Sequence, residues 1–168
     1  MNILIHRKLL SFLLATASTL LFAQSLFAQQ SPIVFSNIAQ KEVVVVDEQG
    51  NESAELTGVD IVVPGDTIVY TSTFTNQGEQ IVSGIAVDNP VPSNTVYINF
   101  SARGENTQVV YSIDNGAIFG NPPELITTGE NGEARTALPE EYTNIRWIYS
   151  GELAPGQSGS VSFKVRIL

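Results

Sequence analysis

Apolar and polar residues alternate along much of this chain with the period of a β-strand. The clearest example is residues 67–75, TIVYTSTFT, in which Ile68, Tyr70 and Phe74 share one face. The other face carries Val69 and four threonines. Because successive side chains of a strand point to opposite faces, one face is expected to be buried and the other solvated. The pattern therefore predicts a strand with a threonine-rich outer face.

Other segments repeat this period, and each has a predicted inward face. They are Ile81–Asp88; Thr95–Ser101, with Val96, Ile98 and Phe100 inward; Gln108–Asp114, with Val109, Tyr111 and Ile113 inward; Asn144–Ser150, with Ile145, Trp147 and Tyr149 on one side; and Ser160–Leu168, with Val161, Phe163, Val165 and Ile167 inward. Ile33–Ile38 and Glu42–Asp47 are further candidate strands.

Turn-forming residues separate these segments. They are Pro64-Gly65-Asp66, Asn76-Gln77-Gly78, Asp88-Asn89-Pro90, Asn115-Gly116, Asn131-Gly132 and Pro155-Gly156. We expect Asp66 to accept a backbone hydrogen bond, and Asn76-Gln77-Gly78 to supply residues that tolerate positive φ. No helical period occurs outside the N-terminal segment. Short strands with turns every 8 to 15 residues predict an all-β fold, an immunoglobulin-like β-sandwich of about 7–9 strands.

Two segments fit this scheme less closely. Residues 115–143 are long for a loop, so a small inserted hairpin or an ordered excursion is expected there. Residues 29–40 form either a free N-terminal arm or the first strand. The remaining residues, 41–168, are predicted to form a single domain.

The N-terminus has the layout of a secretory signal peptide over residues 1–28. A basic patch, His6-Arg7-Lys8, precedes an apolar run of 14 residues from Leu9 to Phe22 and then small and polar residues. This run is shorter than the roughly 20 residues of a membrane-spanning helix. Cleavage is expected after Ala28, with Ser25 as the alternative. The protein is therefore predicted to be secreted, in the extracellular space, at the cell surface or in the periplasm, with no membrane insertion after cleavage.

The charge of the mature chain limits its partners. All 17 carboxylates lie beyond residue 28, against six cations, which gives a net charge near −11. Because phosphate binding needs a basic face, nucleic acid is not an expected partner. The chain has no cysteine, so its stability must come from burial rather than from disulfides.

Composition also argues against an enzyme. The one histidine, His6, leaves with the signal peptide, and the absence of cysteine removes the other common nucleophile. No glycine-rich phosphate loop is present. We assign no catalytic, cofactor-binding or metal-binding residue, and we predict a protein that is not an enzyme.

Two ligands remain as alternatives. Calcium is one, because loop oxygens occur at Asp88-Asn89, Asp114-Asn115 and Glu130-Asn131-Gly132-Glu133, although none forms an alternating Asp-x-Asp-x-Asp loop. Carbohydrate is the other, because Trp147 and Tyr149 lie two apart on a strand and share a face. The simpler interpretation of the loop oxygens is that they belong to ordinary turns. The simpler interpretation of the aromatic pair is that it lies in the core.

Strand addition between copies is the partner hypothesis that the sequence favours. Val43 to Val46 are four β-branched residues in a row, preceded by the apolar segment Ile33–Ile38. A run that is apolar on both faces is either a buried strand or a strand that pairs with another molecule. The alternative is that residues 33–47 pack on the sheet of their own chain.

Five motifs, in order, resemble the "domain of unknown function 11" conserved-repeat family. They are Val63-Pro64-Gly65-Asp66-Thr67 followed by Tyr70; Thr75-Asn76-Gln77-Gly78; Val87-Asp88 with Pro90-Val91-Pro92; Tyr142-Thr143-Asn144-Ile145-Arg146-Trp147; and Leu153-Ala154-Pro155-Gly156-Gln157-Ser158. The resemblance runs from about Val43 to Leu168. It implies an immunoglobulin-like sandwich of bacterial or archaeal surface and secreted proteins, often in tandem, whereas this chain has one copy. It brings no catalytic residues.

The sequence thus predicts a secreted, non-catalytic structural or adhesive module of a cell-surface or extracellular assembly. Its expected partner is protein, either further copies of itself, joined by strand addition, or other surface proteins. The alternative is a small secreted ligand-binding module for carbohydrate or calcium.

Overall fold

The computed structural model describes residues 31–168, and the predicted signal peptide lies outside them. The described residues contain eleven strands and two short 3-10 helices, and all the sheets are antiparallel. The predicted all-β class is confirmed. Residues 31–168 form one compact unit.

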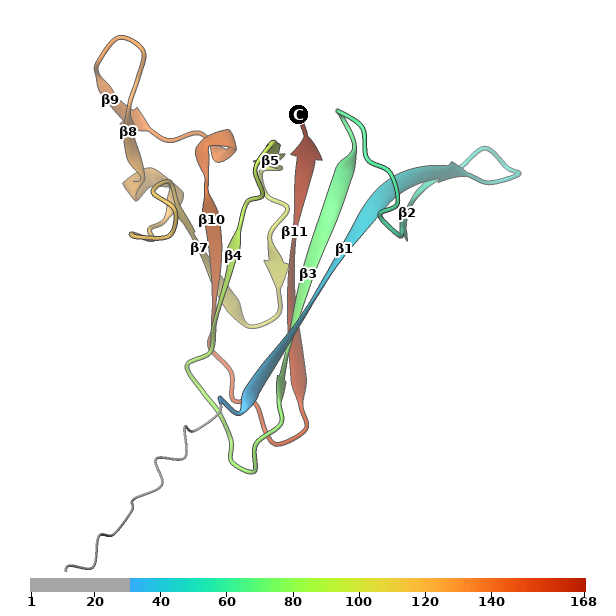
Figure 1. Cartoon of the computed structure of the whole chain (residues 1–168), viewed down its shortest axis with the longest axis vertical. Helices are drawn as coiled ribbons and strands as arrows, with labels where there is room; N and C mark the ends of the chain where they lie inside the picture. The colour runs from blue at the N-terminus through green and yellow to red at the C-terminus, as the bar shows by residue number, and fades with distance from the viewer. Residues whose placement is uncertain (1–30) are drawn as a thin grey trace, which may run out of the picture. The chain divides into compact units, whose positions relative to one another are not determined.

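Two antiparallel sheets make up most of the unit (Figure 1). The larger has the order β2-β1-β3-β11-β5, with β6 also paired to β11; the smaller has the order β4-β10-β7; β8 and β9 form a separate hairpin. The bounds are β1 Ile33–Val46, β2 Glu52–Thr57, β3 Thr67–Asn76, β4 Ala86–Pro90, β5 Thr95–Tyr97, β6 Arg103–Gly104, β7 Thr107–Ser112, η1 Pro122–Glu124, β8 Ile126–Thr128, β9 Ala134–Thr136, η2 Pro139–Glu141, β10 Asn144–Tyr149 and β11 Ser158–Ile167.

The core lies between the inner faces of the two sheets. Trp147 of β10 and Phe163 of β11 are both buried, with ring centroids 6.0 Å apart. The predicted inward residues of the last two strands are correct, since Ile145, Val161 and Val165 are also buried. Burial of alternate apolar residues is the main force that holds the two sheets together.

The prediction for residues 95–101 has the wrong phase. Tyr97 faces the core, opposite Val165 of β11, so its neighbour Val96 faces outward. The strand ends after three residues, and Phe100, which was expected inward, is 80% exposed with a φ of 58°. The Tyr97 hydroxyl lies 3.2 Å from that of Tyr111 and accepts a hydrogen bond from the Ala102 amide. This polar anchor fixes the phase, which apolar alternation alone does not reveal.

The turn motifs behave in two ways. Gly65 and Gly156 have positive φ, and Asp66 accepts the Val63 amide at 2.8 Å, as expected. The expectation of positive φ at Asn76-Gln77-Gly78 is wrong, because none of the three adopts it.

Asn76 instead binds three backbone groups from a fully buried position. Its Nδ2 donates to the carbonyls of Gln80 and Leu153, and its Oδ1 accepts the Gly78 amide. Gly78 is needed for space, because a Cβ there would lie 2.6 Å from that of Pro32. The motif is therefore a buried polar junction between the ends of strands.

Strand β1 joins two segments that the sequence suggested as separate strands. Residues 33–40 belong to the segment predicted to be either a free arm or the first strand, and they lie in β1. The pairing of β1 with β3 runs from Ile33 to Glu42. From Lys41 onward β1 pairs with β2, a strand that the sequence analysis missed. The predicted inserted hairpin in residues 115–143 is present as β8 and β9, and its neighbour Leu125 is buried.

Candidate functional site

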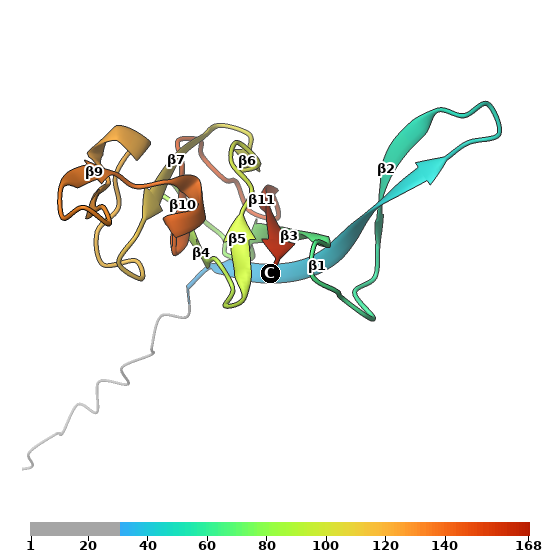
Figure 2. The same ribbon diagram turned by 90° about the horizontal axis from the view of Figure 1, so that it is seen from above.

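The end of β1 and strand β2 form a hairpin that reaches away from the two sheets (Figures 1 and 2). A linker, residues 58–63, then leads from β2 towards β3. We call residues 41–63 the arm, comprising the hairpin, residues 41–57, and this linker. Every residue of β2 is exposed, and the outer edge of β2 pairs with no strand among residues 31–168.

Polar contacts fix the arm at its base and at its tip. At the base, Lys41 Nζ lies 2.6 Å from Asp66 Oδ2, and Glu42 forms an ion pair with Lys164. The side-chain hydrogen bond from Lys41 lowers the pKa of Asp66. At the tip, Asp47 accepts the amides of Gln49 and Asn51. The arm is thus held in shape by polar groups, which leaves its apolar side chains free.

Those apolar side chains are concentrated on the arm. Of the 18 exposed large apolar residues in the described chain, eight lie between residues 44 and 63: Val44, Val45, Val46, Leu56, Val59, Ile61, Val62 and Val63. A cluster of this kind indicates an interaction surface rather than scattered exposure.

The linker has the pattern of a strand without a partner. Val59, Ile61 and Val63 alternate with Asp60 and Val62, and Ile61 is 77% exposed. Within the described residues, no backbone group between Gly58 and Val62 is hydrogen-bonded to another part of the chain. Within its own chain the linker bends at Asp60. Because backbone amides and carbonyls favour pairing, this unpaired segment is free to straighten along a sheet edge.

A groove opens between strands β1 and β4 on one side of the unit. We call it the side groove. It contains two cavities of about 250 and 170 Å³. Phe35, Asn37 and Ile38 line it from β1, and Val87 and Asn89 from β4. The groove exists because the smaller sheet has no strand opposite β1 in the described structure.

The two cavities share polar lining residues and have apolar walls on either side of them. Ser72 Oγ lies 3.1 Å from Asn89 Oδ1 and accepts a hydrogen bond from Asn89 Nδ2 at 2.9 Å. Both residues line both cavities, as does Asn37. Tyr70 and Phe163 contribute apolar wall to the smaller cavity. The groove therefore suits an apolar extended chain.

Strand β4 presents a free edge to this groove. The Val91 amide donates to Thr143, and the Ile85 carbonyl accepts from Tyr149, so both residues bond towards β10. Since residues of an antiparallel pair alternate in this respect, Ala86, Asp88 and Pro90 direct their backbone groups away from β10. Pro90 has no amide to donate, so its carbonyl alone is available.

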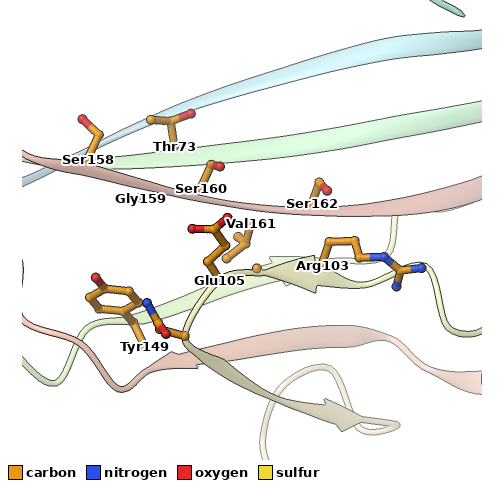
Figure 3. A pocket seen from close by; sticks show the side chains of 11 residues that line it. Thr73, Arg103, Glu105, Tyr149, Ser158, Gly159, Ser160, Val161 and Ser162 are labelled. Atoms are coloured by element: carbon orange, nitrogen blue, oxygen red, sulfur yellow. The ribbon is translucent and has the colours of Figure 1, made fainter.

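A polar pocket of about 540 Å³ lies elsewhere, beside strand β11 (Figure 3). Ser158, Ser160 and Ser162 project from successive outward positions of β11, and Glu105 lies between them and Tyr149. Arg103 and Thr73 complete the polar lining. Hydroxyl, carboxylate and guanidinium groups around a shallow surface can hydrogen-bond a polar ligand.

The structure separates the proposed aromatic pair. Trp147 is fully buried in the core and Tyr149 lines the polar pocket, so the two do not form one exposed platform.

The aspartate carboxylates proposed for calcium already have partners, and in the third proposed segment Asn131 Nδ2 donates to Glu133 Oε2. Arg146 binds both carboxylate oxygens of Asp88 at 2.6 Å. Asp114 accepts the hydroxyl of Ser112, a bond that lowers the pKa of Asp114. Within residues 31–168, no three histidine, cysteine, aspartate or glutamate side chains are grouped as metal ligands would be. In the same residues no helix is long and apolar enough to cross a membrane.

Comparison of the chain with protein-family models, curated proteins and solved structures finds no match. The arm, the side groove and the polar pocket are the candidate functional surfaces of the described residues.

Proposed function

We propose that the mature chain is a secreted structural or adhesive module, without catalysis, that assembles with further copies of itself by strand addition outside the cytoplasm. The observation that carries this proposal is the arm, an ordered projection whose apolar side chains face solvent. Strand addition uses such unpaired edges, with backbone hydrogen bonds for affinity and side-chain pockets for specificity.

Two further observations support a structural role. The two packed sheets and the order of turn motifs are compatible with an immunoglobulin-like sandwich of the conserved-repeat family that the sequence resembles. Each copy also offers dissimilar surfaces, the arm and the side groove. Association of unlike surfaces produces rings or open chains rather than closed two-fold dimers.

The test compares two matched variants of the chain without its signal peptide. One replaces Val44, Val46, Leu56 and Ile61 of the arm by serine. The control replaces four exposed apolar residues elsewhere, Ile81, Ile118, Ile126 and Leu138, by serine. Because all eight are exposed, both variants are expected to fold. Size-exclusion chromatography and electron microscopy should show assemblies for the original chain and the control, and monomers for the arm variant. Assemblies that are identical for all three would contradict the proposal.

The polar pocket beside β11 supports a second candidate, a ligand-binding module for carbohydrate. Its hydroxyls and Tyr149 could hydrogen-bond and stack against a sugar. A glycan array probed with the original chain and with Ser160→Trp, which would fill the pocket, tests this function. Glycan binding that Ser160→Trp abolishes would favour the ligand-binding module. If the array shows no binding, self-assembly remains as the one proposed function.

A further inference from the structure

We propose that the linker segment Val59–Val63 of one copy straightens and inserts as a strand into the side groove of a second copy, next to strand β4. This inference rests on the proposed self-assembly and names the two surfaces that would perform it. In its own chain, Val59–Val63 lines neither cavity of the groove, so a second copy is the occupant to be considered.

Length and backbone chemistry match between donor and acceptor. The linker segment Val59–Val63 has five residues, and the free edge of β4, Ala86–Pro90, also has five. The linker backbone is unpaired from Gly58 to Val62, and β4 turns the backbone groups of Ala86 and Asp88 outward. One added strand would therefore pair two segments that lack partners within residues 31–168.

Side-chain polarity matches as well. If Val59, Ile61 and Val63 face the groove, they meet the apolar walls formed by residues such as Phe35 and Phe163. The cavities of about 250 and 170 Å³ are each several times the ~30 Å³ that one water occupies, so each can receive an aliphatic side chain. Of the two residues that would then face outward, Asp60 is charged and Val62 is apolar.

The charges of the two surfaces are compatible in this orientation. Asp60, the only charged residue from Val59 to Val63, would point outward, away from the apolar walls. The outer face of the smaller sheet carries Arg146 of β10, which forms an ion pair with Asp88 of β4. Because the two charges offset each other, the rim of the groove has no excess charge there. No unpaired charge would be buried by the added strand.

The extra strand would also correct an imbalance between the sheets. The inner face of β1, including Phe35, is uncovered because the smaller sheet ends at β4. A strand next to β4 would lie opposite β1 and cover it. Each copy would then give one strand and receive one, which produces an open head-to-tail chain.

Two adjacent substitutions test the orientation of the donor. Ile61→Asp places a carboxylate on the face directed into the groove, and Val62→Asp places the same group on the opposite face. Both positions are exposed in the monomer, so both variants should fold. Sedimentation velocity should show association weakened about tenfold or more by Ile61→Asp, because the charge would be buried unpaired. Val62→Asp should leave association within about threefold. Equal effects of the two substitutions would overturn the inference.

A cysteine test identifies the acceptor. Because the chain has no cysteine, Val62→Cys and Ala86→Cys each carry one thiol, and a mixture can form a mixed disulfide only between copies. We expect more mixed disulfide between Val62→Cys and Ala86→Cys than between Val62→Cys and the control Asn131→Cys, whose thiol lies in the β8–β9 turn. If the chain assembles but this excess is absent, the groove is not the acceptor and the proposed function still stands. If the original chain never assembles, both proposals fail.

Discussion

Phe35 of β1 and Phe74 of β3 are direct partners across the larger sheet, yet Phe74 is 1% exposed and Phe35 is 46% exposed. The two side chains lie on the same face of neighbouring strands. The smaller sheet covers β3 and stops before β1, and this difference creates the side groove. Burial thus changes over the width of one strand, from core to open surface.

This pair gives the first prediction. Phe74→Ala removes a fully buried ring and should lower the free energy of unfolding by about 3–5 kcal/mol. Phe35→Ala should cost much less in the monomer, about 1 kcal/mol or below, because half of the ring already meets solvent. Urea denaturation at a protein concentration that keeps the chain monomeric measures both. Similar losses for the two variants would mean that the groove is closed in solution.

Asn76 provides the second prediction. Asn76→Ala leaves the carbonyls of Gln80 and Leu153 and the amide of Gly78 without their side-chain partner. Buried groups that lose their hydrogen bonds are costly, so the free energy of unfolding should fall by about 2–4 kcal/mol. Thermal unfolding compared with Asn131→Ala, an exposed asparagine in a turn, provides the control. A loss no larger than that of Asn131→Ala would contradict the role of Asn76 as a junction.

The third prediction concerns acid. Two hydrogen bonds from Arg135 lower the pKa of Glu141 to about 2, helped by the Leu138 amide. A carboxyl whose pKa is lower in the folded state stabilises the protein above its ordinary pKa and loses this contribution as pH falls towards 2. Between pH 5 and 2, Glu141→Gln should therefore flatten the decline of the urea midpoint with acid. Parallel curves for the two proteins would show that the pair makes no contribution.

The fourth prediction concerns calcium. The carboxylates of Asp88 and Asp114 are engaged by Arg146 and by Ser112, so a calcium ion would have to displace existing hydrogen bonds. We expect millimolar calcium to leave the melting temperature unchanged. A clear rise that Asp114→Asn abolishes would revive the calcium-binding alternative.

The sequence predicts the core strands well where one face is apolar. Val161, Phe163 and Val165 are fixed by their alternation, and the structure buries all three. The prediction for residues 95–101 is wrong because the inward face of this segment depends on Tyr97, whose hydroxyl forms hydrogen bonds to other parts of the chain. Alternation carries no information on such tertiary contacts.

The arm shows a different limit. Strand β2 has two glutamates, every side chain exposed, and no buried face, so it lacks the pattern by which strands are predicted. It exists because β1 offers an edge, and the Asp47 turn returns the chain to that edge. The side groove is still less visible in sequence, because it depends on where the smaller sheet ends. The sequence does contain the unusual apolar run Val43–Val46, which indicated a strand able to pair with another molecule and which forms part of the arm.

Salt provides the fifth prediction. Residues 29–168 have a net charge near −11, so copies of this part of the chain repel one another at low ionic strength. Screening by salt should strengthen association driven by the apolar arm, since the Debye length falls to about 8 Å at 0.15 M. Light scattering over a salt series measures this. Association that weakens with added salt would indicate ion pairing as its basis.

Sedimentation velocity of the chain without residues 1–28, over a wide range of protein concentration, tests self-assembly most directly. Head-to-tail strand addition predicts a series of species that lengthens continuously as concentration rises, and that Ile61→Asp shifts to concentrations about tenfold or more higher. A single monomeric species at every concentration and salt level would contradict the account.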